Sequence, residues 1–282
     1  MLRRSFVILM LLYWTSNAFS QSFANRNYGK KLVIRAGTGT SHYFGDLVDN
    51  WHFTVNNNFT AGIRYNVFDR LSFATDATWF MLHGNDATSK DKAPRGLSFF
   101  SNNIEIAGTF QFDLFPDPVR FYRRSAIDPY LFGGLGYLMF SPKTHYQGKV
   151  YALRPLETEG VKYSSYALSF PFGVGIRFKL NAFMNLTVEG GLRYTTTDYL
   201  DDVSSGKFPA PSSVTNPIAR ALSDRSPNQY MSTRGINVRG NPKNKDAYGL
   251  MLVRIEYYLT PLRDSFRTIF YQGTKGRMRR HR

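Results

Sequence analysis

The chain has 282 residues and no cysteine, and 36 Lys and Arg against 20 Asp and Glu give it a formal net charge of +16. The absence of cysteine excludes disulfides and thiolate metal sites. A chain this basic is typical of nucleic-acid binding, but the export signal described next argues against that partner and favours lipopolysaccharide, peptidoglycan or acidic protein surfaces.

Residues 1–20 have the pattern of a secretory signal peptide. Arg3 and Arg4 precede an apolar run, and the small residues Ala18 and Ser20 follow it. A charged start, about ten apolar residues and small residues at −3 and −1 are the features of such a signal. The run is shorter than the about 20 residues of a membrane-spanning helix, so we expect cleavage after Ser20 and export of the rest.

The chain beyond the signal consists of stretches in which apolar and polar residues alternate. In the clearest stretch, Ile104, Ile106 and Phe110 fall on one face and Asn103 and Glu105 on the other. A period of two indicates strands with an apolar face and a polar face. The eight predicted strands are 31–41, 58–67, 71–82, 99–113, 127–140, 168–179, 185–194 and 247–259.

The connections between these strands also alternate in length. Those at 68–70, 114–126 and 180–184 are short, and those at 42–57, 83–98, 141–167 and 195–246 are long. Short periplasmic turns and long outer loops characterise barrels of the outer membrane. The sequence therefore predicts an all-β fold, an eight-stranded antiparallel transmembrane barrel at 21–260 with both termini in the periplasm. A secreted β-sandwich is the alternative that the pattern leaves open.

Strand parity divides the side chains between lipid and lumen. The outward sets are Phe59, Ala61, Ile63, Tyr65 and Val67; Phe170, Phe172, Val174, Ile176 and Phe178; Leu186, Val188, Gly190, Leu192 and Tyr194; and Gly249, Met251, Val253, Ile255 and Tyr257. The inward charged residues are Arg35, Arg64, Asp76, Glu105, Asp113, Arg177, Lys179, Glu189, Arg193, Arg254 and Glu256. Unpaired buried charges are very costly, so we expect these groups to form lumen ion pairs that hold the barrel together.

The sequence indicates no cofactor and no catalytic motif. His42, His52, His83 and His145 fall in predicted outer loops without the spacing of a zinc site. The pair Ser41 and His42, or His145, would suit a lipid-modifying barrel enzyme, but a solvated loop histidine is the simpler interpretation. Asp198, Asp201 and Asp202 could bind calcium. Their spacing does not match an EF-hand, and a solvated or strand-capping acidic turn is the alternative.

The segment 261–282 is a basic tail beyond the last predicted strand. It carries seven cationic residues against Asp264, namely Arg263, Arg267, Lys275, Arg277, Arg279, Arg280 and Arg282. Such a tail is often solvated. In the periplasm it can also bind an acidic partner, so we treat these seven residues as candidate partner-binding residues.

Five short sequence motifs carry information about the protein family that composition and the alternating pattern do not. They are His42-Tyr-Phe-Gly-Asp-Leu47, Pro129-Tyr-Leu-Phe-Gly-Gly-Leu-Gly136, Leu153-Arg-Pro-Leu-Glu-Thr-Glu-Gly160, Pro171-Phe-Gly-Val-Gly-Ile176 and Arg193-Tyr-Thr-Thr-Thr-Asp-Tyr-Leu-Asp-Asp-Val-Ser204. Together and in this order they resemble the PorG family of small outer-membrane barrels of the type IX (Por) secretion system. The resemblance extends to about Tyr258.

This resemblance implies a non-enzymatic subunit of a machine that exports folded proteins and supports gliding motility. It implies association with the periplasmic ring built by PorK and PorN. Contact with outer-membrane lipid and lipopolysaccharide is expected separately, from the barrel pattern and the positive charge of the chain. Two other functional classes stay open: a stand-alone structural or adhesive barrel that uses its long fourth loop, and a lipid-modifying enzyme.

Overall fold

A computed structural model describes residues 32–47, 56–88, 93–116, 124–210, 212–234, 239–241 and 245–259. The predicted signal peptide and the seven cationic residues of the basic tail lie outside these described residues.

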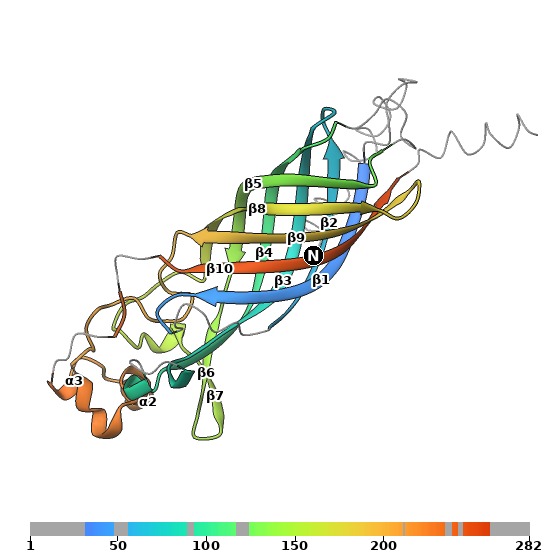
Figure 1. Cartoon of the computed structure of the whole chain (residues 1–282). Coiled ribbons are helices and arrows are strands. Elements are labelled where there is room, and N and C mark those ends of the chain that lie inside the picture. The colour runs from blue at the N-terminus through green and yellow to red at the C-terminus, as the bar shows by residue number, and fades with distance from the viewer. Residues whose placement is uncertain are drawn as a thin grey trace, which may run out of the picture.

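Eight long strands form a closed antiparallel barrel (Figure 1), as the alternating pattern predicts. Their bounds are β1 (Leu32–Phe44), β2 (Asn56–Asn66), β3 (Leu71–Asn85), β4 (Ser98–Asp113), β5 (Ile127–Met139), β8 (Tyr166–Lys179), β9 (Met184–Thr195) and β10 (Ala247–Tyr258). The first and last strands pair along their length, with Val33 opposite Tyr258 and Phe44 opposite Ala247. This pairing closes the sheet, so the barrel proper has no free strand edge.

The outer face of the barrel is apolar and exposed. Along β4, for example, Ile104, Ile106 and Phe110 are exposed whereas Asn103 and Glu105 are buried. All members of the predicted outward sets on β2, β8, β9 and β10 are exposed or half-buried except Gly249, which is buried near the start of β10. An apolar outer surface with a polar lumen is the arrangement of a barrel that spans a membrane.

The two ends of the barrel differ. At one end, which we call the turn end, β2–β3 and β8–β9 are joined by tight turns, with Val67 N donating to Leu71 O at 2.9 Å and Leu180 N to Met184 O at 3.0 Å. The first residues of β1 and the last residues of β10 lie at this end. At the other end, the loop end, the described parts of the long connections gather into a structured cap (Figure 1).

The cap contains secondary structure that the alternating pattern did not predict. The 141–167 connection holds a hairpin of β6 (Pro142–Tyr146) and β7 (Lys149–Ala152), and β6 pairs with β4. The last connection holds α2 (Pro217–Ser223), the 3₁₀ turn η5 (Pro227–Gln229) and α3 (Tyr230–Arg234). Short 3₁₀ turns are η1 (Asp86–Thr88), η2 (Ala93–Arg95) and η4 (Arg154–Leu156). In the part of the chain that the structure describes, no helix is long and apolar enough to span a bilayer.

Local sequence explains these elements. Gln147 and Gly148 have φ angles of 47° and 74° and form the two-residue turn between β6 and β7, a backbone shape that suits the twist of a hairpin. Helix α2 starts with Pro217, and the side-chain oxygen of Asn216 accepts from the backbone N–H groups of Ile218 and Ala219. Both are standard start signals for a helix.

Candidate functional site

The lumen is divided into two halves of different character. In the half nearest the cap, inward side chains of the strands and buried side chains of the cap form a single apolar core. Its members include Phe80, Leu82, Phe99, Leu138 and Leu250 from the strands, and Leu47, Leu97, Phe140, Leu153, Leu200, Val203 and Leu222 from the cap. This core fills the lumen at the loop end. The half nearest the turns is polar.

One cluster of the polar half is centred on Asp76 and Arg254. Arg35 Nε donates to Asp76 Oδ1 at 2.7 Å, and Arg254 Nη1 lies 3.4 Å from Asp76 Oδ2. Arg254 also pairs with Glu189, whose Oε2 accepts from the hydroxyl of Tyr130 at 2.7 Å. Four strands contribute these charges, so the cluster ties distant parts of the barrel wall together.

A second cluster lies closer to the turn end and is centred on Glu256 and Arg177. Glu256 Oε2 lies 3.0 Å from Arg64 Nη2 and 3.5 Å from Arg177 Nε. Arg177 Nη1 also lies 2.5 Å from Asp113 Oδ1 and 3.0 Å from Asp128 Oδ2. The five groups alternate in sign, which compensates for their removal from water.

The third cluster sits where the polar half meets the apolar core. Glu105 accepts from Ser169 Oγ at 2.5 Å and from Tyr248 OH at 2.7 Å, and Arg193 Nε lies 3.4 Å from its other oxygen. A Cβ atom at Gly136 would collide with Ser169 Oγ and with the Glu105 carboxylate. Glycine at this position therefore makes room for the buried acid.

The structure places the inward charged residues as follows. Ten of the eleven are buried and engaged in the three clusters: Arg35, Arg64, Asp76, Glu105, Asp113, Arg177, Glu189, Arg193, Arg254 and Glu256. Lys179 is half-buried at the turn end, where its Nζ donates to Arg124 O at 3.5 Å. Sequence reasoning did not identify Asp128 or the hydroxyls of Tyr130 and Tyr248, although all three have inward parity.

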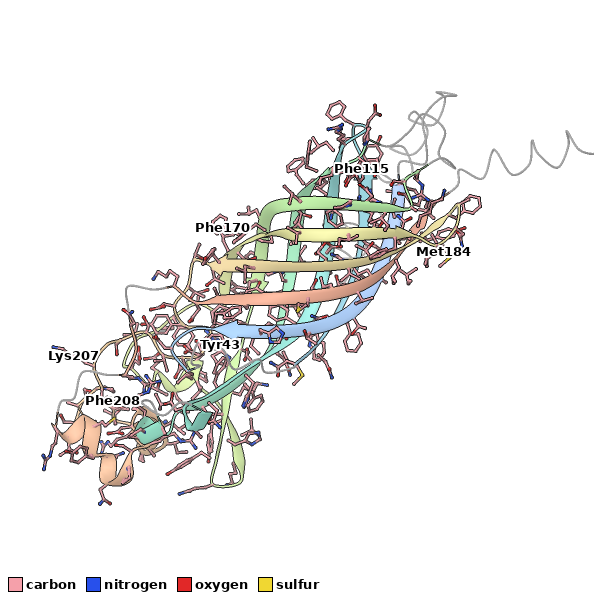
Figure 2. The ribbon with its side chains drawn as sticks, in the orientation of Figure 1. Tyr43, Phe115, Phe170, Met184, Lys207 and Phe208 are labelled. Atoms are coloured by element: carbon pink, nitrogen blue, oxygen red, sulfur yellow. The ribbon has the colours of Figure 1, made fainter. Side chains whose placement is uncertain are left out.

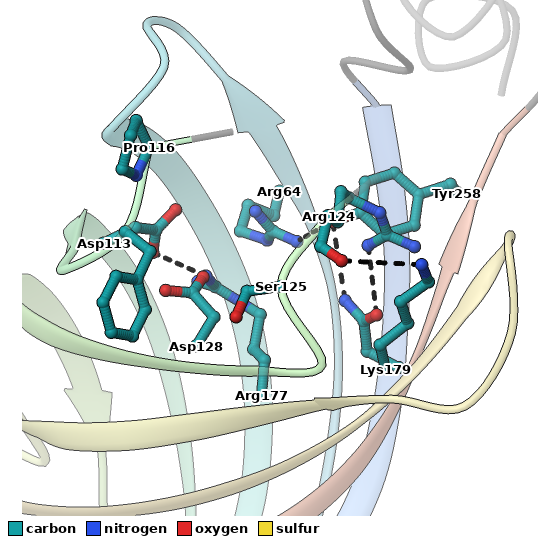
Figure 3. Close-up of a pocket in the computed structure, with 11 residues that line it drawn as sticks. Arg64, Asp113, Pro116, Arg124, Ser125, Asp128, Arg177, Lys179 and Tyr258 are labelled. Atoms are coloured by element: carbon teal, nitrogen blue, oxygen red, sulfur yellow. Dashed lines mark hydrogen bonds and ion pairs between the residues drawn. The ribbon is translucent and has the colours of Figure 1, made fainter. Parts of the chain in front are cut away.

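A pocket opens at the turn end, next to the second cluster (Figure 3). It measures about 370 Å³ with the open solvent at its mouth, and Arg64, Arg124 and Lys179 are among its lining residues. The guanidinium of Arg124 lies 4.1 Å from the centre of the Tyr258 ring, and its Nη1 donates to Asn185 Oδ1 at 3.1 Å. The pocket is therefore lined by cations and by the carboxylates of Asp113 and Asp128, at the end of the barrel where β1 begins and β10 ends.

Two buried arginines hold the connections of the cap together. Arg239 Nε lies 2.8 Å from Glu159 Oε1, and its Nη1 donates to Ser223 O. Arg95 pairs with Asp86 and donates to the backbone oxygen of Arg239. The two guanidinium groups thereby join the second, third and fourth loop-end connections into one unit.

The predicted acidic turn at 197–203 is buried rather than solvated. Asp198 Oδ2 accepts from Ser204 Oγ at 2.7 Å, and Asp201 Oδ2 from the hydroxyl of Tyr43 at 2.6 Å. Burial raises the pKa of Asp202 to about 6 and that of Asp201 well above its usual range. Among the described residues, no three His, Asp or Glu side chains are arranged to hold a metal ion.

Three of the histidines assigned to loops lie in strands instead. His42 is in β1, His83 in β3 and His145 in β6, and His52 lies outside the described residues. Ser41 and His42 are neighbours on a strand, so their side chains point to opposite faces. Ser41 Oγ donates to Met81 O, and the two residues do not form a nucleophile–base pair.

A family model described as a domain of unknown function, DUF6089, matches residues 4–211 of the chain. The chain belongs to the DUF6089 family. No curated protein matches its sequence.

Several solved structures are similar in fold. Neisserial surface protein A is 12% identical with a TM-score of 0.44, over 81% of this chain and 97% of that protein. Ail, the attachment invasion locus protein of Yersinia pestis, is 9% identical with a TM-score of 0.40, over 82% and 99%. The outer membrane protein OprG from Pseudomonas aeruginosa is 11% identical with a TM-score of 0.40, over 83% and 99%. The likeness concerns the barrel fold.

Proposed function

We propose that the protein is a non-enzymatic subunit of the cell outer membrane that anchors a periplasmic assembly. In detail, we propose the barrel subunit of the type IX secretion and gliding machinery, which holds the ring of PorK and PorN at the membrane. The observation that carries the proposal is the filled lumen. An apolar core occupies one half and paired charges the other, so the barrel offers surfaces to partners rather than a passage to solutes.

The turn end is the surface that we assign to the periplasmic partner. An exported barrel with an even number of strands has both ends of its chain on the same side, and short turns face the periplasm in such barrels. The pocket that opens at this end has four cations, Arg64, Arg124, Arg177 and Lys179, against two carboxylates in its lining, and β10 is followed in the sequence by the basic tail at 261–282. An acidic surface on a ring protein would meet both features together.

The stand-alone structural or adhesive barrel is the second candidate. The observation that favours it is the cap, in which the second, third and fourth connections form one folded unit around Arg95 and Arg239. A rigid outer surface of this kind suits contact with other molecules outside the cell.

Photo-crosslinking in whole envelopes separates the two candidates. The crosslinker replaces Asp69, which is exposed in the β2–β3 turn, or Lys207, which is exposed in the cap. The secretion proposal expects PorK or PorN adducts from position 69 and none from position 207. If position 69 gives no periplasmic adduct under mild extraction, the secretion proposal fails and the stand-alone barrel takes its place.

A further inference from the structure

The charges of the cap are sorted by sign. By the cap we mean the described residues of the four loop-end connections, β6 and β7 included. Its exposed charged residues are all cationic: Lys149, Arg154, Lys162, Lys207, Arg234 and Lys245. Lys143, Arg220 and Arg225 are half-buried, as are Asp46, Glu157 and Glu159, and the other acidic residues of the described cap are buried.

Eight of the nine carboxylates of the described cap are engaged in hydrogen bonds or ion pairs within it; the ninth, Glu157, is half-buried. Asp224 accepts from the backbone N–H groups of Ser226 and Ser232, and Asp246 from that of Leu200. The others held in this way are Asp46 by Asn241 N, Asp86 by Arg95, Glu159 by Arg239, Asp198 by Ser204, Asp201 by Tyr43, and Asp202 by Thr158 and Tyr163. The internal hydrogen bonds therefore withdraw negative charge from the surface and leave the cations outside.

This segregation belongs to the cap and does not simply follow from a basic composition. At the turn end, Asp69 and Arg70 are both exposed within one short turn, so the two signs are mixed there. Figure 2 shows Lys207 in the cap, at the opposite end of the molecule from Phe115 and Met184 near the turns. The outward positive field is thus concentrated where the cap extends beyond the barrel strands.

Aromatic rings lie among these cations. Tyr230 on α3 is 47% exposed, and the guanidinium of Arg234 lies 4.8 Å from its ring centre. On the hairpin, the rings of Tyr146 and Tyr151 are 6.4 Å apart, and Arg225 lies 5.8 Å from the Tyr146 ring centre. An aromatic face offers an apolar platform, on which the C–H face of a sugar ring can pack, and the adjacent cation attracts an acidic substituent.

We propose that the cap binds an acidic polysaccharide of the cell surface, a flexible chain with repeated carboxylate or phosphate groups. The cations are distributed over the third and fourth connections, from the hairpin residue Lys149 to Lys245 just before β10. A chain-like polyanion can follow such a distribution, whereas a single small anion needs one convergent pocket. The cap extends beyond the barrel ends (Figure 1), so most of these cations lie away from the level of lipid headgroups. This proposal is independent of the turn-end partner proposed above.

The test uses the full-length barrel refolded in zwitterionic detergent micelles, with polygalacturonate as the probe and neutral dextran of equal length as the control. Wild-type protein should bind polygalacturonate and not dextran, and the affinity should fall as salt rises because exposed charges are screened. The triple variant Lys149→Gln, Lys162→Gln, Lys207→Gln should bind about tenfold more weakly at physiological salt, which corresponds to about 1.4 kcal/mol over the three exposed cations together.

Matched variants and a second ligand make the result decisive. Arg70→Gln removes one exposed cation at the turn end and should bind like wild type, whereas Lys149→Gln alone should bind measurably more weakly. All four positions are exposed, so each variant should keep the heat-resistant folded band on a gel. The proposal is overturned if the triple variant binds polygalacturonate with wild-type affinity, or if Arg70→Gln lowers that affinity as much as Lys149→Gln does. Cap-dependent binding to phosphatidylglycerol vesicles without binding to polygalacturonate overturns it too, in favour of a lipid headgroup.

Discussion

Replacing Glu256 by Gln tests whether paired charges hold the barrel together. The Glu256 side chain is fully buried, and its Oε2 lies 3.0 Å from Arg64 Nη2 and 3.5 Å from Arg177 Nε. Gln has nearly the same size and can still accept from Asn185 Nδ2, which lies 3.1 Å from the same oxygen. The substitution therefore removes one negative charge and little packing.

The two arginines are affected unequally. Arg177 keeps Asp113 at 2.5 Å and Asp128 at 3.0 Å, so its charge stays compensated. Arg64 is 1% exposed, and its nearest remaining partner is the neutral Asn66 Oδ1 at 2.6 Å. Leaving a buried charge without its counter-ion costs about 3–5 kcal/mol. We expect Glu256→Gln to lower the free energy of unfolding by about that amount.

The measurement is urea unfolding of the barrel refolded in micelles, read by the heat-resistant band on a gel. Asp128→Asn is the control, because Arg177 then keeps two carboxylates, and it should cost about 1 kcal/mol or less. The double variant Arg64→Met, Glu256→Met should recover much of the loss, since it removes both charges. An unfolding midpoint of Glu256→Gln equal to wild type, or a loss no larger than that of Asp128→Asn, would refute the reasoning.

Three further predictions concern the cap and the tail. Arg239→Ala should expose the cap to protease while the barrel stays folded. Arg234→Ala, a control at an exposed position, should be cleaved like wild type. Equal cleavage of the two variants would contradict the role of Arg239 in joining the connections of the cap. Burial raises the pKa of Asp202 from 3.8 to about 6, so its ionised form is disfavoured in the folded cap. Cap stability should therefore fall as pH rises through about 4 to 6, and proteolysis of the cap should be faster at pH 7.5 than at pH 5. The protease's own pH dependence is measured with an unstructured substrate. If the cap and that substrate show the same ratio of cleavage rates at pH 7.5 and pH 5, the prediction is wrong. Deletion of the residues after Pro261 should leave membrane insertion intact and lose PorK and PorN on co-purification. Retention of these partners at wild-type levels would move the contact to the turns.

The barrel was predictable because the direction of the side chains in a strand alternates with a period of two residues, and each barrel strand is long enough to show this pattern. Ile104, Glu105 and Ile106 alternate between lipid and lumen, and β4 as a whole keeps that order over sixteen residues. Parity therefore assigned the strands and the direction of their charged side chains. It could not assign partners, because the ion pairs join residues far apart in sequence, such as Arg64 and Glu256.

The cap was not predictable from periodicity because its elements are too short. The β6–β7 hairpin has only five and four residues per strand, and helix α2 has seven. Local signals were present in the two-residue turn at Gln147 and Gly148 and in Asn216 followed by Pro217. These signals give the ends of elements, but the packing of the cap depends on contacts such as Arg95 with Arg239 O, which no local pattern encodes.

The acidic turn at 197–203 shows why a residue type alone misleads. Asp201 and Asp202 sit in a hydrophilic string, which usually indicates a solvated loop. In the structure Tyr43, Thr158 and Tyr163 supply hydroxyl donors to them, so the carboxylates are satisfied while buried. The donors come from the first strand and the third connection, which the sequence places far away.

Buried polar groups without a protein partner occur in both halves of the lumen. Within the described residues, Arg35 Nη1, Gln111 Nε2 and Thr187 Oγ1 lie in the turn-end half, whereas Asn58 Oδ1 and Asn103 Nδ2 belong to residues opposite Phe80 of the apolar core. Buried polar groups of this kind are usually completed by water. The pocket beside Arg124 opens at the turn end, next to the second cluster, so water has a route to the charged groups of that cluster. The apolar core occupies the loop-end half of the lumen, so the barrel can hold this network of charges without forming a channel.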